Sequence, residues 1–298
     1  HSIVNGLVSH IEQRNDVDSE VPCVMIIALV EGRYKVSIPF DEFYQKNPID
    51  MATVNMETKA GREEYVNRCA TMAAKLYSLN VPMVITTIQV DESTDAEAGV
   101  PAYVIVASRK AALDIIEETN YGDRPDGDGP RIQEGDFVRA QITSVARDSI
   151  AVVVGGVDTR VPLHALTFEY LVDARTKYKV GQEIMVQVEQ IIKEKDGHHI
   201  VEVNCKQPEL ERAKQMRSAL PIGSIVFGIV SSVAASKKQP GNINVLAYIK
   251  MYDLPVLVNN MPAKFLGSEP PRGSTVRLKV LNYLDNGMIL CRCIGTQG

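Results

Sequence analysis

The sequence predicts a mostly β protein made of three tandem five-stranded β-barrels, the first with a helical insertion. Short strand-like runs rich in Val and Ile dominate the 298 residues. These runs recur in sets of five, and each set spans roughly 80 residues apart from a longer first set. A turn-rich segment and a short charged helix separate the sets. We therefore expect domains at residues 1–120, 131–207 and 219–298.

The first set opens with a hairpin and ends with a helix. Residues 24–30 and 34–39 are strand-like, and the intervening Glu-Gly-Arg fits a hairpin turn. Strands resume at 82–90 and 102–110, and residues 112–120 form a short closing helix.

A longer helix is expected inside the first set, at residues 61–80. Its apolar side chains recur at spacings of three and four, and Glu63 and Glu64 occupy its first turn. This apolar stripe either covers one end of the barrel or meets a partner.

The second set follows a segment of turn formers and acids, "YGDRPDGDGP" (residues 121–130), which indicates a linker. An Asp-Gly pair within residues 193–199 is typical of a hairpin between the last two strands of this set. A short charged helix at 208–218 leads into the third set, which repeats the scheme from Gly223 to Ile294. Five short strands with a helical segment before the fourth fit a small Greek-key barrel of the OB type.

Charge is distributed unevenly along the chain. Residues 1–120 contain 10 basic and 18 acidic residues (net −8), residues 121–218 contain 14 and 16 (net −2), and residues 219–298 contain 8 and 3 (net +5), which together give the overall −5. An acidic beginning and a basic end indicate different partners for the two ends.

Composition and motifs exclude several functional classes. No run of about 18 apolar residues predicts a membrane span, and no signal peptide is recognisable. An odd number of scattered cysteines, five, favours free thiols in a reducing cytosol and no metal site. Glycine-rich phosphate loops, paired-histidine helices and nucleophile elbows are missing from the sequence. We expect a cytoplasmic, non-enzymatic protein that needs no cofactor.

The second set resembles the RNA-binding repeat of the ribosomal protein S-one type. The stretch "EGDFVRAQITSVARDSIAVVVGGVDTRVPLHAL" is similar to the opening of that repeat, its first strands, its Gly-Gly-Val-Asp hairpin and the Leu before its helix, and "YKVGQEIMVQVEQI" is similar to its fourth strand. In the first set "EGRYKVSIPFDEF" and "VASRKAAL" resemble the third and fifth strands. The third set matches least, through "PIGSIVFGIVSSV" and "PRGSTVRLKVLNYL". The resemblance implies three OB-type barrels and RNA binding.

The second set departs from this family where RNA is bound. Members that bind RNA carry two aromatic residues on strand two and a His at the end of strand three; those positions hold Asp148, Ala151 and Pro162 here. In the first set the His position is Pro39. An acid in place of a stacking ring removes attraction and repels phosphate. Degenerate repeats of the family serve protein contacts, which implies the same alternative for this chain.

The strongest candidate nucleic-acid site lies in the third set, in "NVLAYIKMYD". With a period of two, Tyr248, Lys250 and Tyr252 share one face and are expected to face solvent, while the alternate apolar residues, including Met251, fill the barrel. Bases would stack on the rings, and the surrounding positive charge would attract phosphates. That charge is assigned to Lys264, Arg277, Lys279 and Arg292.

Weaker candidates lie in the other two sets. Arg147 and Arg160 could line a phosphate track, although a salt-bridged, solvated surface is the favoured interpretation for them. His164, near the end of strand three, could contact a nucleotide, although a His at this position is more often structural or simply exposed. Arg109 and Lys110 lie in "ASRKAAL", where the family resemblance implies phosphate contact and the acidic surroundings favour a structural role.

Two functions remain open from the sequence. The preferred reading is an RNA or single-stranded nucleic-acid binding protein that acts mainly through its basic C-terminal domain. The alternative is a protein–protein adaptor, ribosome-associated or from a phage or mobile element, that keeps the OB folds and has lost nucleic-acid binding. Its acidic first domain would then dock a protein partner.

Overall fold

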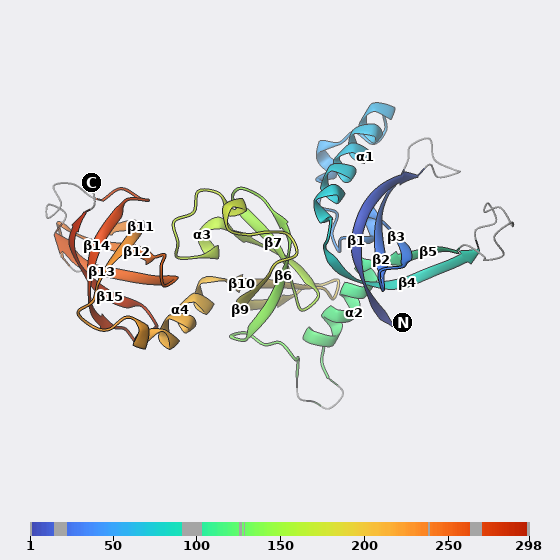
Figure 1. Cartoon of the computed structure of the whole chain (residues 1–298). Coiled ribbons are helices and arrows are strands. Elements are labelled where there is room, and N and C mark those ends of the chain that lie inside the picture. Colours follow the sequence, from blue (N-terminus) through green and yellow to red (C-terminus); the bar gives the residue numbers. More distant parts are fainter. Residues whose placement is uncertain are drawn as a thin grey trace.

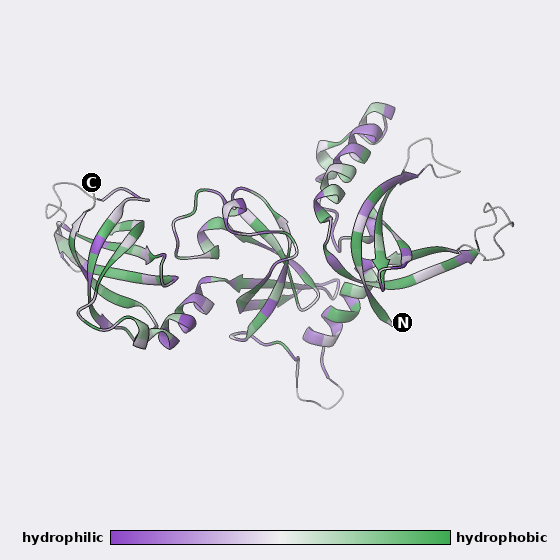
Figure 2. Cartoon of the chain, in the orientation of Figure 1, coloured by the Kyte–Doolittle hydropathy of each residue, from purple (hydrophilic) through white to green (hydrophobic). Residues whose placement is uncertain are grey.

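A computed structural model describes residues 2–14, 23–90, 103–124, 127, 129–237, 239–262 and 270–296. Their strands form three five-stranded sheets, and three separate hydrophobic cores fill them (Figure 1). The strands are largely apolar (Figure 2), and on β14 and at the start of β11 buried residues alternate with exposed ones, because only one side of each strand faces a barrel interior. The predicted mostly β class with OB-type barrels is confirmed.

The first sheet is a closed barrel with the strand order β1-β2-β3-β5-β4. Closure comes from the pairing of β1 with β4, and β3 pairs parallel to β5. This order, in which the fifth strand lies between the third and fourth, is that of the OB-type Greek key. The strands are β1 (Ile3–Arg14), β2 (Cys23–Val30), β3 (Tyr34–Pro39), β4 (Asn80–Val90) and β5 (Tyr103–Ser108).

The helical insertion of the first barrel is α1 (Lys59–Ala73), which continues as a short 3-10 turn, Ala74–Leu76. Thr58 caps its start, with the side-chain oxygen accepting a hydrogen bond from the Gly61 N–H. The helix ends earlier than the predicted residue 80, because Asn80 already begins β4. Its apolar stripe lies in the barrel core through Val66, Cys69, Ala73 and Leu76, so the stripe is a core face and not a free partner surface.

The second sheet is a nearly closed barrel with the order β10-β9-β6-β7-β8. Its edge strands β8 and β10 are joined by the Thr159 hydroxyl, which donates to the Val201 carbonyl at 2.8 Å. A short helix, α3 (Leu163–Leu166), follows β8. The strands are β6 (Phe137–Val145), β7 (Ser149–Val154), β8 (Val157–Pro162), β9 (Glu183–Lys193) and β10 (His199–Asn204).

The third sheet is a closed barrel that repeats the topology of the first, with the order β11-β12-β13-β15-β14. Here too the third and fifth strands, β13 and β15, pair in parallel. The strands are β11 (Ile225–Ala235), β12 (Asn242–Ile249), β13 (Leu254–Pro262), β14 (Thr275–Tyr283) and β15 (Ile289–Thr296). None of the described helices is both long and apolar enough to span a bilayer.

Two helices connect the barrels, which lie in a row (Figure 1). The helix α2 (Arg109–Tyr121) lies between the first and second barrels, and α4 (Lys206–Gln215) lies between the second and third. Tyr121, expected in a linker, is the last residue of α2; its ring lies in the second core and its hydroxyl donates to the Val154 carbonyl at 2.9 Å. The end of the first repeat is therefore also part of the second barrel.

The β7–β8 turn approaches α2 so closely that it requires glycine. Gly156 has a φ of +101°, and a Cβ there would lie 2.4 Å from the Glu117 backbone nitrogen. Gly197, in the β9–β10 turn, has a similar φ of +95° and faces open space. Both positions need the positive φ that glycine adopts without strain, but only Gly156 has a helix packed against it.

We therefore expect Gly156→Ala to destabilise the protein more than Gly197→Ala. Both variants strain a left-handed backbone, but only Gly156→Ala forces α2 away, which should add about 1–3 kcal/mol. Urea unfolding of both variants measures the difference. Equal losses of unfolding free energy would contradict the close docking of α2.

Candidate nucleic-acid interface

A cleft of about 720 Å³ separates the second barrel from the first. From the second barrel it is lined by β7, β8 and the start of β10, including Ile150, Ala151 and Arg160. From the first barrel it is lined by residues 44–46, Pro48 and the end of α1 with its 3-10 turn. Strands two and three of the second barrel thus face the first barrel across an open space.

Four cations line this cleft. Lys46 pairs with Glu194 at 2.7 Å, and Arg160 donates to the Ser149 hydroxyl at 2.7 Å while lying 3.5 Å from Asp148. Lys75 and Lys110, from the first-barrel side, also line the cleft and form no ion pair within the described part of the chain. The cleft also holds acids, among them Asp158 and Asp196, so its charge is mixed.

The cleft lacks the stacking rings of the RNA-binding repeat on its second-barrel side. Ala151 lies in the lining and Asp148 is exposed beside Arg160, as the sequence comparison implied. The aromatic ring in the lining, Tyr44, comes from the first barrel and packs 5.0 Å from the Phe43 ring centroid. Burial raises the pKa of Tyr44 to about 12, so it stays a neutral phenol. Phosphate contact by cations fits this surface better than base stacking.

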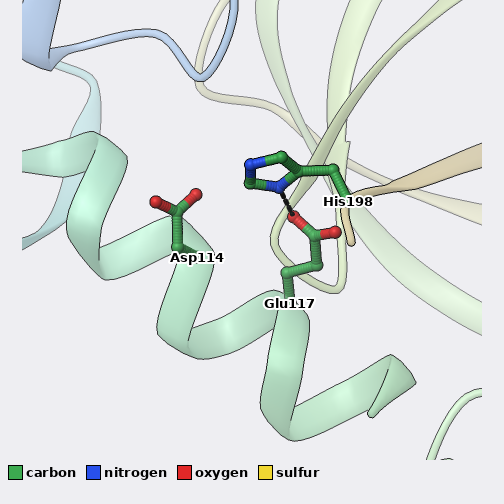
Figure 3. Close-up of side chains that lie close together, drawn as sticks. All are labelled: Asp114, Glu117 and His198. Carbon is green, nitrogen blue, oxygen red and sulfur yellow. Dashed lines mark hydrogen bonds and ion pairs between the residues drawn. The ribbon is translucent and has the colours of Figure 1, made fainter. Parts of the chain in front are cut away.

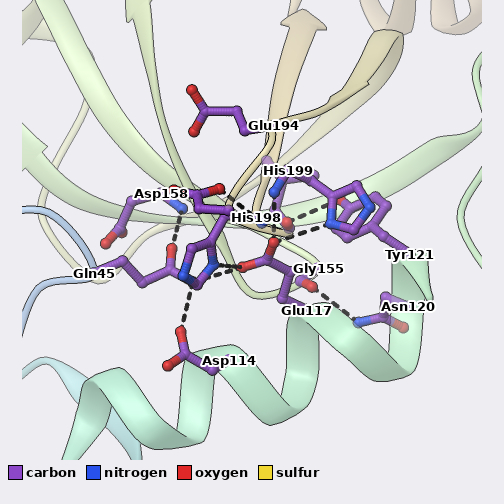
Figure 4. Close-up of polar contacts among 12 residues, drawn as sticks. Gln45, Asp114, Glu117, Asn120, Tyr121, Gly155, Asp158, Glu194, His198 and His199 are labelled. Atoms are coloured by element: carbon purple, nitrogen blue, oxygen red, sulfur yellow. Dashed lines mark hydrogen bonds and ion pairs between the residues drawn. The ribbon is translucent and has the colours of Figure 1, made fainter.

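The carboxylate of Glu117, on α2, holds the two barrels together beside the cleft (Figure 4). Its side chain is 5% exposed. One oxygen accepts from the His199 backbone N–H at 2.6 Å and lies 3.0 Å from His199 Nδ1. The other accepts from Gln45 Nε2 at 2.9 Å and lies 3.3 Å from His198 Nδ1. Gln45 extends the contact, because its amide oxygen accepts from the Asp158 N–H at 3.2 Å.

Three side chains at this contact could hold a metal ion: Asp114, Glu117 and His198. Ligand atoms of Asp114, Glu117 and His198 all lie within 4.8 Å of one another (Figure 3). Two carboxylates and an imidazole are the donor types of zinc or manganese sites. The Gln45 amide donates to both Asp114 and Glu117, at 3.3 and 2.9 Å. Hydrogen bonds within the protein therefore already satisfy these carboxylates.

The expected strip of Tyr248, Lys250 and Tyr252 does not form on one solvent-facing strand, and this orientation was wrong. Tyr248 is 1% exposed, whereas Met251, assigned to the core, is 86% exposed. Tyr248 keeps the side of β12 opposite to the core residues Ala247 and Ile249, but Lys177 of the second barrel covers its ring. After Ile249, residues 250–253 form a turn, which ends the alternation for Lys250, Met251 and Tyr252. Lys250 is exposed in this turn, and Tyr252 packs partly against the third core.

Tyr248 lies in the contact between the second and third barrels. Its hydroxyl is hydrogen-bonded to the Asp253 carboxylate, and the Lys177 ammonium lies 5.5 Å from its ring centroid. Burial raises its pKa. Asp253 also forms an ion pair with Arg212 of α4. A ring enclosed in this way cannot stack on a base, so Tyr248 is a structural residue.

Arg109 is likewise buried rather than available to phosphate. It is 1% exposed, donates to the Phe43 carbonyl at 2.7 Å, stacks 4.7 Å from the Phe43 ring centroid and lies 3.6 Å from Asp158. This burial favours the structural role that its acidic surroundings suggested, because its guanidinium connects the first barrel to β8. Its neighbour Lys110 points to the cleft described above.

The other candidates lie on the surface. Arg147, in the β6–β7 turn, and His164, on α3, are exposed, and Arg160 lies in the cleft. Arg277 and Lys279 on β14 and Arg292 on β15 are all exposed. Lys264 lies outside the described residues. Nucleic-acid contact by these exposed cations stays a prediction.

Sequence reasoning missed Phe227. It lies on β11 directly opposite Arg277, and its side chain is 54% exposed. The signal was its parity: Val226 and Gly228 are buried on either side of it, and β11 alternates regularly at this point. An exposed phenyl ring beside a cation has the chemistry to stack on a base.

Residues 131–199 match the S1 RNA binding domain family, which confirms the resemblance for the second barrel. No curated protein is significantly similar to the chain. Among solved structures, a multidomain protein with nucleic acid binding domains from Streptococcus pneumoniae is 11% identical, with a TM-score of 0.23 over 98% of this chain and 72% of that one. The Drosophila Unr CSD456 structure is 11% identical, with a TM-score of 0.19 over 100% of this chain and 97% of that one. At such TM-scores neither likeness supports an argument.

The Glu117 contact predicts a loss of stability on truncation. Glu117→Ala leaves the buried His199 N–H without its acceptor, which should cost about 1–3 kcal/mol of unfolding free energy. The exposed neighbour Glu118→Ala is the matched control. Urea unfolding measures both, and a Glu117 variant as stable as the control would refute the role of this carboxylate.

His198 makes part of this contact depend on pH. Its hydrogen bond to Glu117 raises its pKa above the usual 6.5. The imidazolium therefore stabilises the folded chain fully below pH 6.5, and this contribution is lost as pH rises through the raised pKa. We expect His198→Gln to lower the melting temperature at acidic pH and to have a smaller effect at alkaline pH. The exposed His164→Gln variant serves as the control; identical pH profiles for both variants would contradict the prediction.

Proposed function

We propose that this protein binds RNA or single-stranded nucleic acid without transforming it, and that the third barrel supplies most of the binding. The observation that carries the proposal is the S1 RNA binding domain match over residues 131–199. Strands two and three of that domain line an open cleft with four cations, Lys46, Lys75, Lys110 and Arg160. A strand entering the cleft would contact both the first and second barrels.

The third barrel is favoured as the main contributor by its charge. Residues 219–298 carry 8 basic and 3 acidic residues, whereas the first 120 carry 10 and 18. Each phosphate neutralised by a cation releases counterions and adds salt-sensitive affinity. A single strand would therefore be attracted to the third barrel and repelled by much of the first. We place the protein in the cytoplasm, because its scattered cysteines favour a reducing compartment.

Specific observations also favour the alternative function, a protein–protein adaptor. The second barrel has Asp148 and Ala151 where its family has stacking aromatics and Pro162 where the family has His. Tyr248 of the third barrel is buried in the contact with the second barrel. Under this alternative a basic protein partner would dock on the acidic first barrel. The two functions differ in whether free single-stranded RNA binds the purified chain.

Fluorescence anisotropy with labelled single-stranded RNA and DNA tests the proposal. The logarithm of the binding constant should fall linearly with the logarithm of salt concentration, with a slope of about −0.7 per phosphate contact. Replacing Lys75 and Lys110 together by Gln should make the slope shallower by about 1.4 if both reach phosphates. The control is Lys59→Gln, at the exposed start of α1. Absence of binding to either nucleic acid at low salt would favour the adaptor.

A further inference from the structure

We infer that the outer surface of β11, β14 and β15 on the third barrel, which we call the basic face, binds the phosphates and bases of a single strand. The inference rests on the proposed function and gives it a second site, separate from the cleft. The basic face consists of Ile225, Phe227, Arg277, Lys279 and Arg292.

Strand register brings these side chains together. Ile225 on β11 lies opposite Lys279 on β14, and Lys279 in turn lies opposite Arg292 on β15. Phe227 lies opposite Arg277. Alternate residues Val226, Leu278 and Cys291 are buried, so the five named side chains share the outward side. Directly opposed side chains on neighbouring strands lie close enough to interact.

The charge of this face is unbalanced. The three strands contain no Asp or Glu, and Arg277, Lys279 and Arg292 form no ion pair within the residues that the structure describes. Like charges directly opposite each other, as Lys279 and Arg292 are, destabilise a sheet. An anion bound between them would remove this repulsion. Successive outward cations on β14 are about 6.7 Å apart, a separation that suits successive phosphates of an extended strand.

Exposed apolar side chains border the cations. Ile225 and Phe227 are 50% and 54% exposed, on the strand next to Lys279 and Arg277. A flat ring beside cations matches the two parts of a nucleotide, because bases stack on aromatic rings while phosphates pair with Arg and Lys. A partner without bases would use only the cations, and an apolar protein partner would use only Ile225 and Phe227. A single strand uses both.

The second barrel shows what the corresponding surface looks like without this excess of charge. There Arg139 on β6 lies 3.6 Å from Glu183 on β9, and Phe137 on β6 is 41% exposed. Positive charge on that surface is thus paired with an acid. Phe137 and Arg139 provide matched control positions for the basic face.

The test compares full-length variants in binding to single-stranded RNA and to inorganic polyphosphate, which has no bases. Phe227→Ala should weaken RNA binding about 5- to 150-fold with little change in salt slope. The triple variant Arg277→Gln, Lys279→Gln, Arg292→Gln should make the RNA salt slope shallower by about 2 and weaken polyphosphate as well. Phe227→Ala should leave polyphosphate binding unchanged, and the controls Phe137→Ala and Arg139→Gln should leave RNA binding unchanged.

The outcomes of these experiments distinguish failure of the basic face from failure of the proposed function. RNA binding by the wild type that neither basic-face variant weakens overturns the basic face and leaves the proposed function in place. No RNA binding by the wild type overturns both. Protection of Lys279 from acetylation by bound RNA, read by mass spectrometry on the wild type, supports the face without relying on the folding of any variant, and unchanged acetylation at saturating RNA overturns it.

Discussion

The buried carboxylate of Glu117 is the contact on which the arrangement of the first two barrels depends. A charge in that position is costly unless hydrogen bonds satisfy it, and here donors converge on it from both barrels. Gln45 comes from the first barrel, and the His199 N–H comes from the second. Separating the barrels would leave these groups unpaired or return them to water. Lys75 and Lys110 line the cleft beside Glu117, opposite β7 and β8.

A buried carboxylate also joins a connecting helix to the second barrel on the side of the third barrel. Glu209 of α4 is buried and accepts from the Thr167 hydroxyl at 2.5 Å and the Phe168 N–H at 2.9 Å. Burial raises its pKa. Each connecting helix thus carries an acid that ties it to the second barrel, and each also packs onto a turn of the barrel that follows: α2 onto Gly156, and α4 onto Gly287. Both helices thus pack against the barrels on either side of them in the row (Figure 1).

The fold was largely predictable because it depends on local features of the sequence, namely strand periodicity, turn residues and helical spacing. Strand periodicity and the Asp-Gly turn identified three five-stranded barrels, and the spacing of Val66, Cys69 and Ala73 identified the helix of the first. The candidate site was less predictable, because it depends on contacts between barrels. Nothing local to Arg109 or Tyr248 reveals that a neighbouring barrel encloses it. Tyr248 keeps its outward side on β12 but is covered by Lys177 of the second barrel, whereas the turn that follows Ile249 exposes Met251. The cations of β14, assigned from the sequence only as surrounding positive charge, are exposed between buried residues.

We propose that one single strand can contact both the cleft and the basic face. Amide hydrogen exchange of the full-length chain, with and without a saturating single-stranded RNA, tests it most directly, because exchange reports where backbone hydrogen bonds become protected. We expect slower exchange in β7 and β8 and in β11, β14 and β15, with the outer strands of the first barrel unchanged. Protection confined to the first barrel, or no protection at saturating RNA, would contradict it.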